Sequence, residues 1–78
     1  MKPVEELKIW LEQESILQFH MADNDPLLLE MVVAELGDLR VNLIHNETPE
    51  LRAEYNEMYN TLVALLDLRI DKFARGIR

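Results

Sequence analysis

The chain has 78 residues, no cysteine and a formal net charge of −7. Its length suits one domain with a marginal core, the lack of cysteine excludes disulfides and thiolate metal sites, and its charge disfavours non-specific binding to nucleic acid or anionic membranes. A hydrophobic fraction of 49%, with two glycines and three prolines, is not typical of disorder. We therefore expect residues 1–78 to form a single folded domain.

The apolar residues are dispersed along the chain. The longest uninterrupted apolar run, residues 62–66, has five residues, whereas a membrane-spanning helix needs about 20. The N-terminal residues turn acidic at Glu5 and Glu6 and lack the apolar stretch of a signal peptide. We expect a cytoplasmic protein that does not bind membranes.

The first predicted helix covers residues 3–22, beginning at Pro3. Its apolar residues fall within an arc of about 140° when plotted at helical spacing: Val4, Leu7, Trp10, Leu11, Leu17 and Met21. Glu14 projects into this arc, where it could reach solvent, pair with Arg40 or lie between subunits. Ile9 and Ile16 lie on nearly the opposite side and Phe19 on a flank, so they are not needed for the core of a monomer.

The second predicted helix covers residues 26–45. Asp25 before Pro26 is typical of a helix start, with a capping side chain followed by proline at the first helical position. The expected core stripe alternates steps of three and four and is widened by three neighbours: Leu29, Val32, Leu36, Leu39 and Leu43, with Leu28, Val33 and Ile44. Leu27, Met31, Ala34 and Val41 form a second apolar strip. Gly37 is a tolerated weak position, a site of close helix approach or a break.

The third predicted helix covers residues 49–75, from the Thr48–Pro49 start to a basic last turn before Gly76. Its stripe is expected to comprise Leu51, Tyr55, Met58, Leu62, Leu65, Leu66, Ile70 and Phe73. At 1.5 Å per residue it spans about 40 Å, against about 30 Å for the others. Short connections favour antiparallel neighbours. We expect an all-α, three-helix up-down-up array whose long third helix overhangs by roughly two turns.

No residue pattern indicates chemistry. Most carboxylates fall on polar faces, the chain has two histidines, one serine and no Glu-x-x-His pair, and Asp23-Asn24-Asp25 lacks the later glycine and glutamate of a calcium loop. We expect no enzyme activity, no catalytic residue, no metal site and no cofactor. A weak catalyst or metal carrier is the least favoured of three functional hypotheses.

The surplus apolar residues suggest self-association into a larger helical bundle. The candidate interface comprises Ile9, Ile16, Phe19, Leu27, Met31, Val41, Ile70, Phe73 and Ile77. Residues 1–68 hold fourteen acidic and four basic residues, a net of −10, while residues 69–78 hold four basic and one acidic, a net of +3. The four basic residues could dock an acidic partner or complement the helix dipole: Arg69, Lys72, Arg75 and Arg78.

The favoured hypothesis is therefore a non-enzymatic protein–protein interaction module, a small adaptor or regulator acting as a homodimer with a protein partner. The alternative is an acidic inhibitor that mimics nucleic acid and binds a basic DNA- or RNA-binding protein. Direct nucleic-acid binding is not expected, because four basic residues beside so much negative charge make a weak phosphate site.

Overall fold

The computed structural model describes residues 2–77, which form three helices. They are α1 (Pro3–Ile16), α2 (Pro26–His45) and α3 (Pro49–Ala74), with no strand in this part of the chain. The all-helical prediction and its three helix starts are confirmed, and α3 ends at Ala74 rather than Arg75. Arg78, one of the predicted docking residues, lies outside the described residues.

Local chemistry sets the predicted helix boundaries. The Asp25 carboxylate accepts a hydrogen bond from the Leu27 amide at 3.0 Å, and the Thr48 hydroxyl accepts one from the Leu51 amide at 3.1 Å. At the end of α3, Gly76 has a φ of 84°, which favours glycine. The Gly76 and Ile77 amides donate to the carbonyls of Phe73 and Lys72. This is the Schellman arrangement that ends many helices.

The predicted end of α1 is wrong. The helix stops at Ile16, and residues 17–25 form an irregular connector. The Lys72 ammonium donates hydrogen bonds to the backbone carbonyls of Glu14 and His20, and the Ala22 amide donates to the Glu14 carboxylate. A helix through residue 22 would have turned these backbone groups toward their own helical neighbours. The connector is therefore fixed by α3 rather than by helical bonding.

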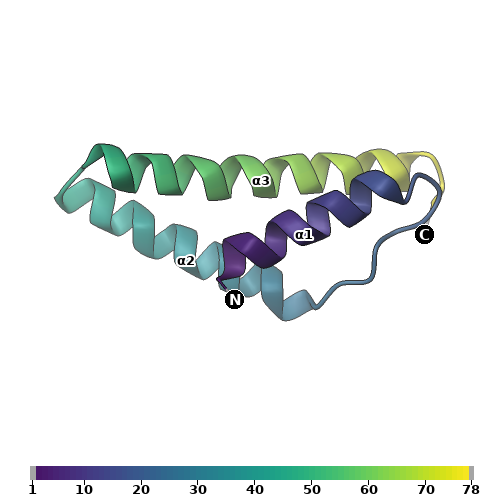
Figure 1. Cartoon of the computed structure of the whole chain (residues 1–78), viewed down its shortest axis with the longest axis horizontal. Helices are drawn as coiled ribbons and strands as arrows, with labels where there is room; N and C mark the ends of the chain where they lie inside the picture. Colours follow the sequence, from purple (N-terminus) through teal and green to yellow (C-terminus); the bar gives the residue numbers. More distant parts are fainter. Residues whose placement is uncertain (1, 78) are drawn as a thin grey trace.

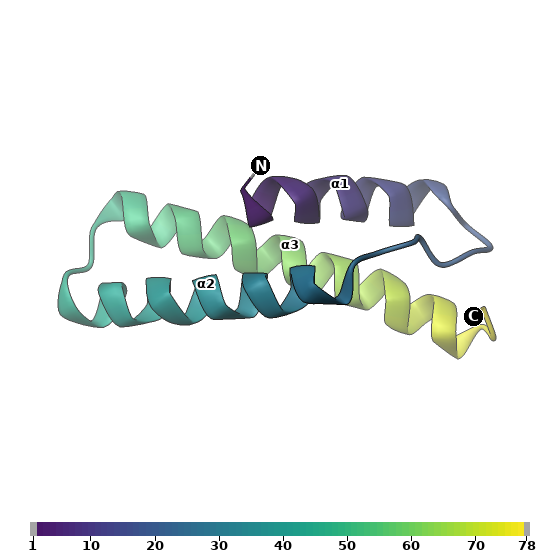
Figure 2. The same cartoon turned by 90° about the horizontal axis from the view of Figure 1, so that it is seen from below.

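The three helices are staggered rather than stacked over a common length. Figures 1 and 2 show α3 extending along the whole molecule, with α2 beside its N-terminal half and α1 beside its C-terminal half. The longest extent is 43 Å, and α1 and α2 contact each other less than either contacts α3. The predicted overhang of α3 is therefore wrong, because α1 and the connector cover the part that contains Lys72.

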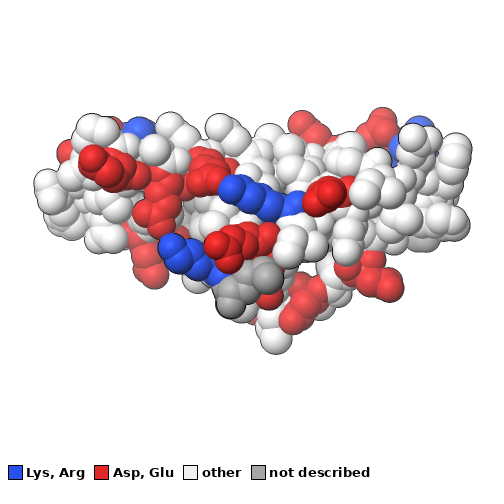
Figure 3. All heavy atoms as spheres, viewed as in Figure 1, with Lys and Arg blue, Asp and Glu red and all other residues white. Residues whose placement is uncertain are grey.

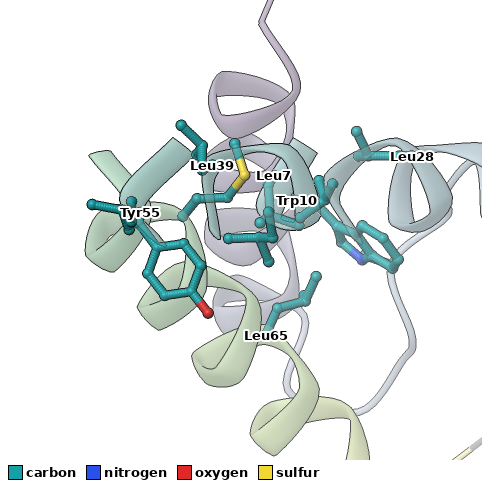
Figure 4. Packing of buried hydrophobic residues seen from close by; sticks show 11 residues of the cluster. Leu7, Trp10, Leu28, Leu39, Tyr55 and Leu65 are labelled. Atoms are coloured by element: carbon teal, nitrogen blue, oxygen red, sulfur yellow. The ribbon is translucent and has the colours of Figure 1, made fainter. Parts of the chain in front are cut away.

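The hydrophobic core is drawn from all three helices. Figure 4 shows Leu7 of α1, Leu39 of α2 and Leu65 of α3 turned toward a common interior. The core comprises Leu7, Trp10, Ala22, Leu28, Val32, Leu36, Leu39, Leu43, Tyr55, Met58 and Leu65. Val33 and Ile44 of the stripe predicted for α2 are 59% and 75% exposed, so that stripe was drawn too broadly.

Gly37 lies inside α2. The helix continues through Gly37, where an added Cβ would meet no atom within 4 Å, so neither a break nor a close approach explains this glycine.

None of the described helices has the length and apolar content needed to cross a membrane.

Candidate functional site

A buried ion cluster joins α1, the connector and α3. The side chains of Glu14 and Lys72 are almost fully buried, with residue exposures of 1% and 2%. The Lys72 ammonium lies 2.6 Å from Glu14 Oε1 and 2.6 Å from the Glu14 carbonyl oxygen, and it also donates to the His20 carbonyl at 2.8 Å. Lys72 thus provides hydrogen-bond donors both for the Glu14 carboxylate and for the backbone carbonyls near the end of α1.

The other donors to Glu14 complete its hydrogen bonding. Arg69 and the Trp10 indole each donate to Oε2 at 2.9 Å, and the Ala22 amide donates to Oε1 at 3.1 Å. The Arg69 guanidinium also lies 5.2 Å from the centre of the Trp10 ring, within the range of a cation–π contact. No buried side-chain nitrogen or oxygen among residues 2–77 lacks a hydrogen-bond partner.

Opposing effects set the protonation of Glu14. Burial raises the pKa of its carboxyl, but the hydrogen bonds from Lys72 and the other donors together outweigh burial, and the pKa lies below its usual value. The carboxylate is therefore charged near neutral pH. Because its oxygens are already engaged and shielded from water, the cluster is built to hold the fold rather than to transfer protons.

The observed partners of Glu14 and of Arg40 both differ from the pair predicted from the sequence. Glu14 was considered as a partner of Arg40, but Arg40 donates to the Tyr55 hydroxyl at 2.7 Å and Glu14 pairs with α3. A signal was available, because alternating steps of four and three along the buried face of α3 continue past Leu65 to Arg69 and Lys72. The predicted stripe instead continued through the nearby apolar residues Leu66, Ile70 and Phe73.

The predicted basic docking residues are not a group of exposed cations. Lys72 is buried against Glu14, so placing it on a docking surface was wrong. The Arg69 side chain is 27% exposed and pairs with the same carboxylate. Arg75 is at the surface, where it pairs with Asp71 at 3.0 Å. Arg69 and Lys72 therefore join α3 to α1, whereas the Arg75–Asp71 pair is local to the end of α3.

The predicted interface residues are mostly exposed, as expected, and they are spread over the three helices and the connector. Ile9 and Ile16 lie on α1, Phe19 on the connector, Leu27, Met31 and Val41 on α2, and Ile70 and Phe73 on α3. Ile77 is partly buried in the turn after α3. Their role in association stays a prediction.

One apolar strip on α3 is longer and more regular than the others. It comprises Tyr59, Val63, Leu66, Ile70 and Phe73, which we call the α3 strip. The spacing alternates four and three residues, so these side chains share one helix face. Their exposures run from 39% for Leu66 to 65% for Ile70. Of these five residues, only Ile70 and Phe73 were among the predicted interface residues, whereas Leu66 was predicted only as part of the core stripe of the third helix.

The α3 strip borders two shallow hollows. One, of about 390 Å³, is lined by Met21, Leu66, Arg69, Ile70, Phe73 and Ala74. The other, of about 240 Å³, lies between Tyr59 and Val33 of α2. The connector therefore extends the apolar face beside the C-terminal part of the α3 strip, and α2 extends it beside Tyr59.

Charged side chains occupy other parts of the surface. On the face shown in Figure 3, acidic groups are scattered and basic groups lie between them. Lys8 of α1 forms an ion pair with Glu57 of α3 at the surface. Within residues 2–77, no group of three or more histidine, aspartate or glutamate side chains is arranged to hold a metal ion.

Comparisons of the chain with known protein families, with curated proteins and with solved structures found no match.

Proposed function

We propose that this protein is a non-enzymatic interaction module, a small adaptor or regulator that works as a homodimer in the cytoplasm. The observation that carries the proposal is the α3 strip, five large apolar side chains on one face, each 39% or more exposed. Contiguous apolar surface of this kind marks protein interaction sites.

The physical argument is the gain from covering this surface. Burial of apolar surface stabilises by roughly 25 cal/mol per Å², and a twofold dimer is the commonest way for a soluble chain to achieve it. A chain of 78 residues also buries a smaller fraction of its surface on folding than a larger domain does. Association therefore provides both a function and additional stability.

Sedimentation equilibrium over the micromolar concentration range tests the proposal. The wild type is expected to shift from monomer to dimer, whereas Ile70→Glu is expected to stay monomeric with unchanged helix content by circular dichroism. Ile44→Glu is the matched control, because Ile44 is also exposed but lies on α2 away from the α3 strip. A wild type that stays monomeric at high micromolar concentration contradicts the homodimer.

The same measurement separates this proposal from the nucleic-acid-mimic alternative. A dimer held by apolar contacts persists or tightens in high salt, since salts that strengthen apolar burial favour it. Binding of an acidic surface to a basic protein weakens as salt screens the charges. The mixture of charges on the face in Figure 3 gives the alternative less support.

A further inference from the structure

We infer that the α3 strip pairs with the same strip of a second copy in antiparallel orientation, with the twofold axis at the level of Leu68. This inference rests on the proposed homodimer and adds the surface, the orientation and the register.

The order of side chains along the strip is self-complementary in the antiparallel direction. Val63 and Phe73 lie five residues to either side of Leu68, and Leu66 and Ile70 lie two residues to either side. Two antiparallel copies therefore place Val63 opposite Phe73 of the second copy, and Leu66 opposite Ile70. The layer of Val63 and Phe73 pairs a small side chain with a large one. The layer of Leu66 and Ile70 pairs two side chains of similar size.

A parallel, in-register pair has no such match. Phe73 would meet Phe73 of the second copy in one layer, and Val63 would meet Val63 in another. The first layer would be crowded and the second underfilled, and both conditions destabilise packing. The antiparallel register avoids both.

The hollow at the strip supplies a place for the opposing side chains. It has a volume of about 390 Å³, and Met21 of the connector forms one wall beside Leu66 and Ile70. These two residues flank the level of the proposed axis, so each copy offers a hollow where the other presents Leu66 and Ile70. This is the knob-into-hole geometry of paired helices.

Charge favours a second copy over a basic partner at this surface. The five positions of the strip carry no charged residue, although the chain has a net charge of −7. Two acidic chains repel least where they meet through uncharged surface. A basic partner would instead be attracted to the acidic surface elsewhere.

The area of the strip fits a weak, specific dimer. The five residues together expose the equivalent of about two and a half fully exposed residues, on the order of 500 Å² per copy, because a large apolar residue presents roughly 200 Å² when fully exposed. Flanking atoms covered by the same contact bring the buried total toward the low end of specific interfaces, below about 1,200 Å².

Cysteine cross-linking tests the orientation, because the natural chain contains no cysteine. The variants are Val63→Cys, Phe73→Cys and the double variant. In the antiparallel pair, Val63 is displaced by about 15 Å along the axis from Val63 of the second copy, as is Phe73 from Phe73. A disulfide needs Cα atoms within about 7 Å. Under mild oxidation, only the double variant is expected to form a covalent dimer.

The controls separate this inference from the proposed homodimer. The double variant cannot close a disulfide within one chain, because its two cysteines are about 15 Å apart on one helix. Ile44→Cys with Phe73→Cys is the matched control and is expected to give no covalent dimer. Sedimentation of each reduced variant shows whether it still dimerises.

Each outcome supports or overturns a defined statement. Covalent dimers from a single variant show parallel pairing and overturn the antiparallel register. Reduced variants that dimerise without any cross-linking place the interface elsewhere and overturn the assignment to the α3 strip. In both cases the homodimer remains, whereas a wild type that never dimerises overturns the homodimer and this inference together.

Discussion

The Lys72 ammonium of α3 lies 2.6 Å from both the Glu14 carboxylate and the Glu14 backbone carbonyl. One side chain thus neutralises a buried acid and provides a hydrogen bond for the backbone where α1 ends. Because the two residues are 58 positions apart, this contact ties the first helix to the last.

Replacing Lys72 by methionine is expected to destabilise the fold by about 3–5 kcal/mol, because Glu14 would lose its main countercharge while staying buried. That is comparable with the whole stability expected of a chain of this size. Urea denaturation followed by circular dichroism measures the change.

Two further variants serve as controls for Lys72→Met. Arg75→Met breaks the exposed pair with Asp71 and is expected to cost no more than about 1 kcal/mol. Glu14→Gln combined with Lys72→Met removes the uncompensated charge and is expected to recover part of the loss. A double variant less stable than Lys72→Met alone would contradict the assigned role of the pair.

Stability is expected to fall in acid through Glu14. Its pKa is lowered in the folded protein by the hydrogen bonds that outweigh burial, so its contribution is fully present above the unfolded pKa of about 4.3. The contribution is lost as the pH falls from there through the folded pKa. Urea denaturation from pH 7 to pH 3 should therefore show the stability difference between wild type and Glu14→Gln narrowing below about pH 4.3. A constant difference would exclude this linkage.

Gly37→Ala is expected to stabilise the protein by up to about 1 kcal/mol, because alanine favours the helix and the added Cβ meets no atom within 4 Å. Gly76→Ala is the matched comparison. It also has open space, but its φ of 84° is strained for alanine, so a loss of about 1–2 kcal/mol is expected. Thermal unfolding of both variants measures the two changes in stability. If both variants are stabilised, or both destabilised, backbone conformation does not decide the effect of the substitution.

The helix starts were predictable because their causes are local. A capping side chain followed by proline lies within the few residues that it affects, as at Asp25 and Thr48. The buried positions of α2 at alternating steps of three and four were also predictable, because periodicity reports directly on a helix face.

The end of α1 and the ion cluster were not predicted, since their cause is distant in sequence. Leu17 and Met21 continue the helical pattern, but Lys72 holds the backbone in another path. The cluster also places polar residues where the pattern of α3 would suggest apolar ones. A search for apolar periodicity alone passes over such positions.

The stagger of α1 and α2 along α3 has a consequence for how the chain folds. The hairpin of α2 and α3 is continuous in sequence and can form from near neighbours, but its far end carries Arg69 and Lys72 toward a site that only α1 completes. Neither Glu14 on α1 nor Arg69 and Lys72 on α3 can be buried away from water alone, because each would then carry a charge without a partner. We therefore expect docking of the N-terminal segment and dehydration of the C-terminal turns to be coupled, so that the two ends of the polypeptide fold and unfold together.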